Sequence, residues 1–196
     1  MKKRKIAVFD FDGTLTTKDT LLEFVKFTCG CRRFCLGFVL FLPLMVLMKL
    51  GVYPNWKCKQ QFFSWFYKGM DYERFKHLGN LFADRGISLL RKDIAEKVKE
   101  YRSSKIDVYI VSASIEEWVI PVARCLNVVN VLGTKVEVDS KNKLTGYFST
   151  KNCYGQEKVN RLMEKEPDRD KYYLYAYGDS NGDKEMLAFA DEGFWI

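Results

Sequence analysis

Residues 6–16 read IAVFDFDGTLT, an apolar run that ends abruptly in two aspartates on either side of one phenylalanine. The run 6–9 is typical of a short buried strand, and Gly13 allows the chain to turn away after it. Ligands of open α/β sheets bind at the carboxyl ends of parallel strands, where this pattern places Asp10 and Asp12. Two carboxylates so close together repel each other unless a cation or a proton relieves them. The stretch therefore predicts a metal site whose other ligands come from elsewhere in the chain.

The composition is that of an ordinary folded protein. The chain has 196 residues, of which 47% are hydrophobic and 29% charged, enough for one domain with an inserted lobe. Its net charge of +7 favours an anionic partner such as a phosphorylated substrate or an acidic membrane face, although an excess of this size is also common. We expect no nucleic-acid partner.

Cysteine usage and the N-terminus indicate the compartment. The six cysteines form no repeated C-x-x-C pair and His77 is the only histidine, which argues against a structural zinc site. The basic residues 2–5 precede only four apolar residues, too few for an export signal. We therefore expect a cytoplasmic protein with reduced thiols.

The segment 34–48 carries no charged residue and admits two interpretations. It falls short of the roughly 20 apolar residues that span a bilayer, and Pro43 is expected to kink a helix there. In one interpretation it is a helix buried within a helical lobe. In the other, its apolar face dips into a membrane at the inner surface of the cell and the neighbouring cations lie near lipid headgroups. These cations are Arg32, Arg33, Lys49, Lys57 and Lys59.

Local signals predict that a helix begins near Thr20. Thr20 and Glu23 have the spacing of a capping box, and Asp19 is an alternative cap that could also face the active site. A further amphipathic helix is predicted from Ile87, because apolar residues recur every three or four positions as far as Tyr101.

The second half of the chain alternates between predicted strands and helices. Strands are predicted at 106–111, 172–177 and 193–196, helices at 116–126 and from Gly155, and a hairpin from 130–139 and 144–149. This alternation predicts an α/β fold with a doubly wound, Rossmann-like parallel sheet.

Three predicted strands end in polar residues, which are Asp10, Asp12, Ser112, Asp179 and Asp183. Right-handed crossovers place these strand ends at one edge of the sheet, where they form a single site together with Lys158. Carboxylate oxygens suit Mg²⁺, which binds through few protein ligands plus water and substrate phosphate. Ser112 and the amides after it can donate to phosphate oxygens, and Lys158 offers a point positive charge.

Two other uses of acidic or phosphate-binding loops are excluded. An EF-hand requires Gly at the sixth position and Glu at the twelfth, but counting from Asp10 these positions hold Leu15 and Leu21, and counting from Asp179 gives no better match. The chain also contains no P-loop signature, so nucleotide hydrolysis of that type has no support.

The motifs resemble those of the haloacid dehalogenase superfamily. The four matching features, in the order of that superfamily, are the DxDGT of residues 10–14, Ser112, Lys158 and the GDSxxD of residues 178–183. The long insertion between the first and second motifs is similar to the cap of the phosphoserine-phosphatase-like branch, subfamily IB. The segment 153–159 and the apolar insertion resemble the bacterial phosphatidylglycerophosphatase C family. Gly182 departs from the asparagine that phosphoserine phosphatases usually carry there.

The resemblance implies a role for each motif residue. Asp10 would attack phosphorus, while Asp12 would protonate the leaving alcohol and later activate water. The implied catalytic residues are Asp10, Asp12, Ser112 and Lys158. The implied phosphate-binding positions are Phe11, Asp12, Ser112, Ala113 and Lys158. The implied Mg²⁺ positions are Asp10, the backbone carbonyl of Asp12, Asp179, and Asp183, which would orient a metal-bound water.

The resemblance also implies an organisation and an activity. Residues 1–17 and 91–196 would form the catalytic core, and 18–90 a helical cap of the C1 type. The implied enzyme is a Mg²⁺-dependent phosphomonoester phosphatase with an aspartyl-phosphate intermediate, and its substrate a lipid phosphate such as phosphatidylglycerophosphate. The alternatives are phosphoserine or another small phosphorylated metabolite, for which Asp19 and Arg32 or Arg33 would be the polar groups within the cap. A mutase and a non-catalytic, membrane-associated interaction protein also remain open.

Overall fold

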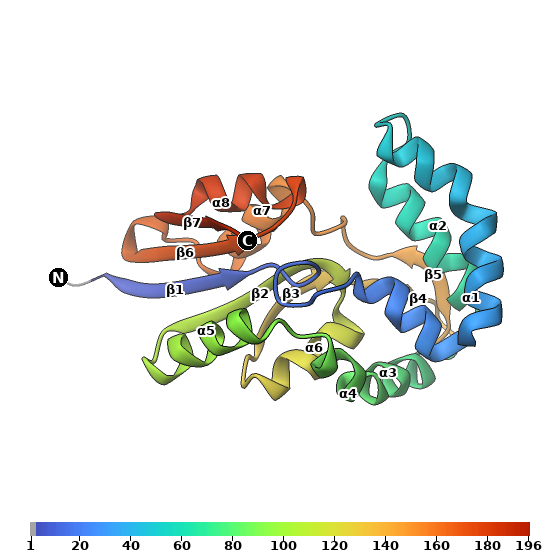
Figure 1. Ribbon diagram of the computed structural model, residues 1–196, viewed down its shortest axis with the longest axis horizontal. Coiled ribbons are helices and arrows are strands. Elements are labelled where there is room, and N and C mark those ends of the chain that lie inside the picture. The colour runs from blue at the N-terminus through green and yellow to red at the C-terminus, as the bar shows by residue number, and fades with distance from the viewer. Residues whose placement is uncertain (1–2) are drawn as a thin grey trace.

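A five-stranded parallel sheet forms the centre of the computed structural model, which describes residues 3–196 (Figure 1). Its strand order is β3-β2-β1-β6-β7. The strands are β1 (Arg4–Phe9), β2 (Asp107–Ile115), β3 (Asn130–Thr134), β6 (Tyr172–Gly178) and β7 (Glu192–Trp195). The predicted doubly wound parallel sheet is confirmed.

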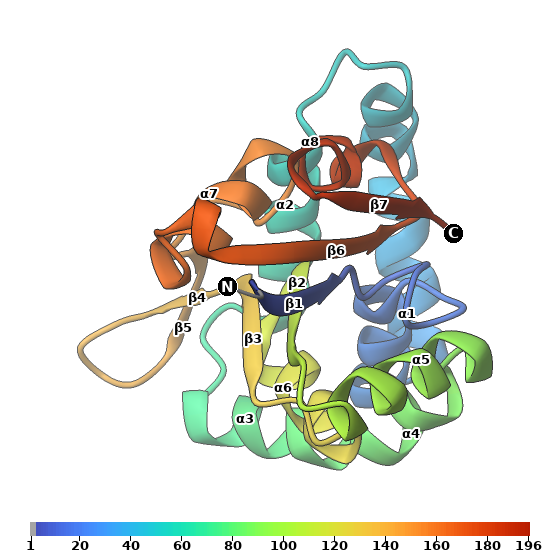
Figure 2. The same ribbon diagram turned by 90° about the vertical axis from the view of Figure 1, so that its left-hand side faces the viewer.

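Helices cover both faces of this sheet (Figures 1 and 2). The covering helices are α5 (Lys92–Ser103) and α6 (Glu116–Cys125) on one face, and α7 (Gln156–Lys165) and α8 (Lys184–Phe189) on the other. Alternate side chains of β1 point to the two opposite faces of the sheet, as in any strand. Ile6 and Val8 pack in the cluster that includes α7 and α8, whereas Ala7 and Phe9 belong to the larger cluster on the other side.

Four helices lie between β1 and α5 in the chain, and we propose that they form the cap at residues 18–90. They are α1 (Thr20–Lys49), α2 (Asn55–Tyr67), α3 (Tyr72–Leu81) and α4 (Ala83–Ser88). The pair α1 and α2 projects from one end of the molecule, while α3 and α4 lie under α6 (Figure 1). The hairpin of β4 (Val136–Val138) and β5 (Leu144–Phe148) packs against α2.

The helix predicted near Thr20 begins there, whereas the boundaries of one other helix and of the hairpin differ from the prediction. The capping-box residue Thr20 does not cap α1, because the alternative, Asp19, accepts a hydrogen bond from the Leu22 amide at 3.1 Å. The helix predicted from Ile87 begins only at Lys92. Between the two helices, the chain bonds to the turn after β1 through the Leu89 carbonyl and the Arg91 amide, and this interrupts the helix.

The predicted hairpin is shorter than expected. Only Val136–Val138 pairs with Leu144–Phe148, whereas Asn130–Thr134 joins the main sheet beside β2. There Leu132 is buried against the sheet, so the first half of the predicted strand gains a core position that a free hairpin does not offer.

Segment 34–48 is not the buried helix of the first interpretation. It lies in α1 beyond a kink at Gly30, where φ is 78°. Phe34 and Gly37 are its buried residues, and Gly37 faces α2, where a Cβ on Gly37 would lie 2.4 Å from the ring of Phe66. By length and composition α1 could cross a membrane.

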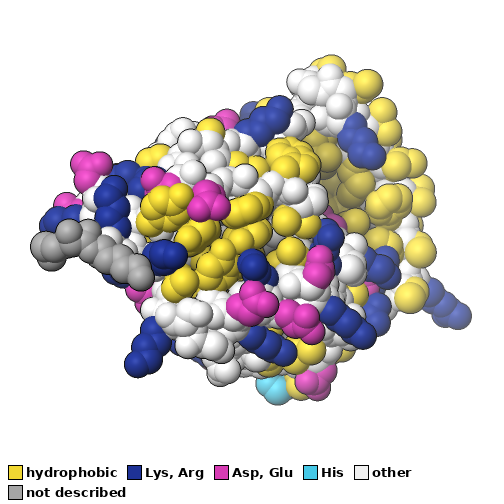
Figure 3. Space-filling model, turned by 60° about the vertical axis from the view of Figure 1, so that its left-hand side comes forward, with side chains coloured by type: hydrophobic (Ala, Val, Ile, Leu, Met, Phe, Trp, Pro, Cys, Tyr) yellow, Lys and Arg dark blue, Asp and Glu magenta, His cyan; other side chains and the backbone are white. Residues whose placement is uncertain are grey.

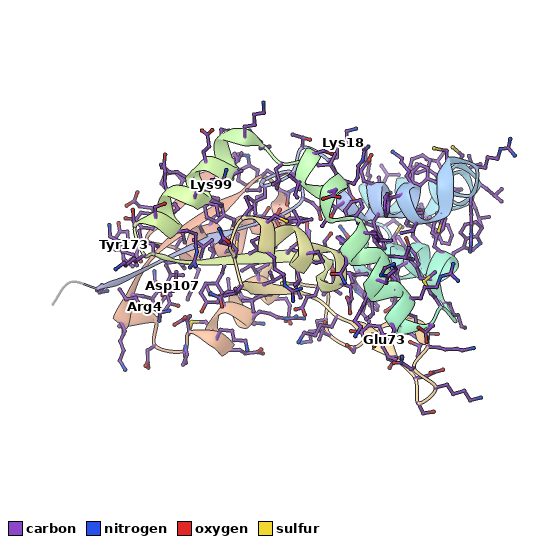
Figure 4. The ribbon with its side chains drawn as sticks, turned by 90° about the horizontal axis from the view of Figure 1, so that it is seen from below. Arg4, Lys18, Glu73, Lys99, Asp107 and Tyr173 are labelled. Carbon is purple, nitrogen blue, oxygen red and sulfur yellow. The ribbon has the colours of Figure 1, made fainter. Side chains whose placement is uncertain are left out.

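The end of the sheet opposite the cap is closed by ion pairs. Arg4 on β1 bonds to Asp107 at 2.7 Å and to Glu166 at 2.8 Å, which ties β1 to β2 and to the chain after α7. Arg4 and Asp107 lie together far from α1 and α2 (Figure 4). This end holds the strands in register and leaves their carboxyl ends facing the cap.

Candidate active site

The register of the sheet brings the predicted motifs together. Phe9 pairs with Ile110 of β2 and with Tyr177 of β6. Asp10 therefore follows directly after β1, between Ser112 on one neighbouring strand and Asp179 after the other. The strand β2 continues past Ser112 to Ile115, but its pairing with β3 becomes irregular after Val111. The ends of β1, β2 and β6 that carry these residues therefore lie at one edge of the sheet, as predicted.

Lys158 lies at the centre of the site. Lys158 lies in the first turn of α7, and its side chain is only 2% exposed. Its Nζ lies 2.5 Å from Asp10 Oδ1. The same ammonium bonds to Asp183, which is fully buried. The other oxygen of Asp183 accepts hydrogen bonds from the amide and the hydroxyl of Ser180, at 3.0 and 2.7 Å. Asp183 is therefore held on both sides.

Three carboxylates are placed to hold a metal ion. One oxygen each from Asp10, Asp179 and Asp183 lie within 4.8 Å of one another. Thr14 donates a hydrogen bond to Asp179 at 2.8 Å, and Gly13 allows the carboxylate to approach the turn. A Cβ on Gly13 would lie 2.2 Å from Asp179 Oδ2, and its φ of 88° also favours glycine. Three carboxylates against one ammonium leave an excess negative charge that a divalent cation with oxygen ligands would balance.

Burial makes the charged form of Asp10 unfavourable. Desolvation raises the pKa of Asp10 to about 7, against the lowering effect of Lys158. Burial also raises the pKa of Asp179. For Lys158, desolvation lowers the pKa, but Asp10 and Asp183 outweigh it and raise the pKa overall. A cation beside Asp10 would stabilise its carboxylate, which is the form needed for nucleophilic attack.

Asp12 is held by a hydrogen-bond network that the sequence analysis did not predict. Its Oδ1 accepts from the amide and the hydroxyl of Thr20, at 2.7 and 2.6 Å. Its Oδ2 accepts from the hydroxyl of Ser114. Trp118 in turn donates to the Thr20 hydroxyl at 3.1 Å. Ser112 and Ser114 are two residues apart on β2 and so share one face, which is the signal that could have identified Ser114.

A cavity of about 730 Å³ lies between these groups and the cap. Its polar end contains Asp10, Asp12, Asp19, Lys59, Ser112, Ala113, Lys158 and Ser180. Its apolar end is lined mainly by Leu21, Leu22, Phe38, Leu42, Met45, Val46 and Phe62. Asp19 thus both caps α1 and faces the site. Lys59, expected beside lipid headgroups, instead enters the cavity and donates to the Ala113 carbonyl at 2.9 Å.

Other predicted residues lie outside the cavity. The Phe11 side chain is fully buried in the core, and its carbonyl accepts a hydrogen bond from the Thr16 amide. Arg32 and Arg33 do not line the cavity; Arg33 lies over the Trp65 ring, 5.6 Å from the centroid. The structure therefore brings together every predicted catalytic and metal residue, and of the polar groups considered for a small metabolite it places only Asp19 in the cavity.

The departure at Gly182 has a steric reason. A Cβ at this position would lie 2.3 Å from the ring of Tyr154, which also lines the cavity. The Tyr154 ring occupies the space that an asparagine side chain would need, so this position accommodates only glycine while Tyr154 is in place.

A sequence model of haloacid dehalogenase-like hydrolases matches residues 7–188. The chain belongs to this family. It is 34% identical over 188 residues to the protein CicA of Caulobacter vibrioides, covering 95% of this chain and 83% of that protein. The predicted family is thus confirmed.

Solved structures share the fold. A protein of unknown function from Bordetella pertussis has a TM-score of 0.75 at 18% identity, covering 95% of this chain and 87% of its own. A phosphoserine phosphatase solved as a phospho-aspartyl intermediate analogue has a TM-score of 0.64 at 19% identity, covering 96% and 84%. Family and fold agree, and the chain is therefore a haloacid dehalogenase-like hydrolase.

The raised pKa of Asp10 predicts a pH-dependent stability. Its folded pKa of about 7 exceeds its ordinary value of 3.8, so folding favours the protonated form. Between these two values, rising pH therefore lowers the stability of the metal-free protein. From about pH 5 to about pH 8, Tm should fall more for the wild type than for Asp10→Asn, by several degrees, since about 1 kcal/mol moves Tm by about 2–4 °C.

Mg²⁺ should restore Tm at the upper pH in the wild type but not in Asp179→Asn, because the cation relieves the carboxylates that it binds. Thermal unfolding followed by circular dichroism measures both effects. Equal pH slopes for the wild type and Asp10→Asn would contradict this assignment.

The network around Asp12 predicts a leaving-group effect. Ser114→Ala removes one of its hydrogen bonds and should slow release from an alkyl phosphate by roughly tenfold or more, because general acid catalysis contributes about 10²–10⁴. The initial burst of nitrophenol from p-nitrophenyl phosphate should keep its rate, since nitrophenolate leaves without a proton. Stopped-flow and steady-state assays measure the two steps.

The matched control for this test is Ser149→Ala, which removes a hydroxyl bonded to the Val136 carbonyl in the hairpin. It should leave both rates unchanged. An equal loss of the burst and of alkyl phosphate turnover in Ser114→Ala would indicate a purely structural role.

Proposed function

We propose that the chain is a Mg²⁺-dependent phosphomonoester phosphatase that works through an aspartyl-phosphate on Asp10. The observation that carries the proposal is the cavity, which joins a nucleophile, a buried ammonium and a carboxylate cluster at one end to an apolar lining at the other. The charged end fits a phosphoryl group, and the apolar end fits the alcohol to which it is attached.

Asp10 and Asp12 would divide the work between attack and proton transfer. A carboxylate oxygen of Asp10 attacks phosphorus, the bond from phosphorus to the alcohol oxygen breaks, and Asp12 gives that oxygen its proton. Asp12, now ionised, then takes a proton from water, and the resulting hydroxide attacks phosphorus and releases phosphate and the Asp10 carboxylate. The hydrogen bonds from Thr20 and Ser114 hold Asp12 for both transfers.

The acidic groups fit the cation that this chemistry needs. Asp10, Asp179 and the backbone carbonyl of Asp12 would hold Mg²⁺, with Asp183 orienting a water bound to it. Asp183 is better suited to this outer role because Lys158 and Ser180 already occupy its oxygens. When bound, the cation supplies positive charge beside the transferring phosphoryl group.

Lys158, Ser112 and the backbone after Asp10 and Ser112 would bind the phosphoryl oxygens. Lys158 is buried, so its charge acts on the phosphoryl group with little screening by water. Ser112 is fully buried, faces the cavity and accepts from the Ser114 amide at 2.9 Å, which orients its hydroxyl. Phe11, Asp12 and Ala113 would contribute backbone amides.

A lipid phosphate, such as phosphatidylglycerophosphate, is the substrate that suits the apolar end of the cavity best. Leu42, Met45 and Val46 come from the uncharged part of α1 and would contact an acyl chain. A small polar phosphate such as phosphoserine is the second candidate, because Asp19 and Lys59 lie near the charged end and could pair with its amine and carboxylate. In either case the enzyme would act in the cytoplasm, and for a lipid at the inner face of the membrane.

The substrate assay compares phosphate release from phosphatidylglycerophosphate in mixed micelles, phosphoserine and p-nitrophenyl phosphate, each with Mg²⁺ and with chelator. We expect Mg²⁺-dependent release, greatest from the lipid, and a loss of roughly 10³-fold or more in Asp10→Asn because the nucleophile is absent. Lys59→Met should weaken phosphoserine turnover more than lipid turnover.

Release that persists in Asp10→Asn would contradict the assigned nucleophile. Turnover of phosphoserine alone would indicate that the apolar end of the cavity only packs the core and binds no substrate. Absence of release from every ester would favour a mutase or a protein without catalysis.

A further inference from the structure

The far end of α1 and the loop to α2, residues 36–56, present an exposed apolar surface that we call the cap tip. Its most exposed side chains include Leu36 (64%), Val39 (67%), Leu40 (57%), Leu50 (70%), Val52 (70%) and Trp56 (46%). Figure 3 shows hydrophobic side chains over the lobe of α1 and α2 and around the hollow beside it. Soluble monomers rarely expose large contiguous apolar surface, so this one indicates a binding partner.

The charge around the cap tip defines the chemistry of that partner. Residues 24–70 contain seven lysines and arginines and no aspartate or glutamate, a number equal to the net charge of the whole chain. Lys49 lies within the cap tip, where it also borders the cavity, and Lys57 directly follows the cap tip; both side chains are exposed. An apolar surface bordered by cations matches an anionic phospholipid bilayer, in which acyl chains lie beneath negative headgroups. A second copy of the chain fits poorly, because it would bring the Lys49 and Lys57 side chains of the two copies together without any acidic partner in residues 24–70.

The packing of α1 determines how far it could enter a bilayer. Gly37 allows close contact with the Phe66 ring, and Phe41 meets Phe62 edge-on at 5.7 Å between centroids. If α1 crossed a bilayer alone, these aromatic contacts with α2 would be lost. The kink at Gly30 and Pro43 within the helix also interrupt a straight span. The helix pair therefore suits shallow insertion side by side.

We propose that the cap tip docks into the interfacial layer of an anionic phospholipid bilayer, with Lys49 and Lys57 at the headgroups. The cavity wall formed by Leu42, Met45 and Val46 belongs to the same segment, so the docked tip brings the apolar end of the cavity to the membrane. The docking goes beyond the proposed function and stands whether or not the substrate is a lipid.

Flotation with vesicles tests the apolar contact. The wild type should float with vesicles of phosphatidylcholine and phosphatidylglycerol, and much less with phosphatidylcholine alone. Leu50→Ser with Val52→Ser should lower the partition coefficient by roughly tenfold or more, because two exposed apolar side chains no longer enter the bilayer. The control pair Leu81→Ser with Val129→Ser removes side chains that are 52% and 79% exposed outside the cap tip, and should bind as the wild type does.

Charge removal tests the electrostatic contact. Lys49→Gln with Lys57→Gln should weaken binding to the anionic vesicles by roughly 30-fold, since each of the two cations contributes about 1 kcal/mol near such a surface. Lys92→Gln with Lys99→Gln is the control of equal charge; Lys99 lies on α5, away from the cap (Figure 4). Turnover of soluble p-nitrophenyl phosphate, measured on the same samples, reports the catalytic site separately.

Four results would overturn the docking. They are no binding to anionic vesicles, unchanged binding of the cap-tip variants, resistance to alkaline carbonate extraction (which would mean that α1 spans the bilayer), and a dimer that only the Leu50→Ser, Val52→Ser variant loses. Vesicle binding without any turnover would leave the docking supported and the proposed function contradicted.

Discussion

An excess of negative charge at the carboxyl ends of β1 and β6 is the constraint on which the site depends. Asp10, Asp179 and Asp183 converge there around the single ammonium of Lys158. The surrounding residues keep this arrangement compact, since Thr14 holds one carboxylate and Ser180 another. Burial is the main cause of the raised pKa of Asp10, and the charges of Asp183 and Asp12 raise that pKa further. A divalent cation and a phosphoryl group together would balance the charges.

The network around Asp12 connects this site to the proposed cap. Thr20 is the first residue of α1, Ser114 lies on β2, and Trp118 lies on α6, where its ring stacks on Phe24 with 4.6 Å between the centroids. Asp12, the proposed proton-transfer residue, is therefore held by three elements at once. Movement of α1 would move the partner of Asp12, so the position of the cap and the alignment of the general acid are physically coupled.

The sequence predicted the strand ends and the order of the motifs because both follow from short local patterns. Asp10, Ser112 and Lys158 met in the structure as expected, since right-handed crossovers leave one arrangement for parallel strand ends. The position of Lys59 could not be predicted, and the exposure of α1 stayed one of two interpretations, because both depend on how the helix pair sits over the sheet. The break near Leu89 was missed because its cause is a hydrogen bond to a turn more than 70 residues away.

The central claim is that Asp10 receives the phosphoryl group, and trapping that group tests it most directly. Asp12→Asn lacks the base for the second step, so a rapid acid quench after mixing with p-nitrophenyl phosphate should leave a phosphorylated protein. Mass spectrometry of its peptides should place the phosphoryl group on Asp10. A phosphoryl group on Ser112, or turnover without any phosphorylated peptide, would contradict the account.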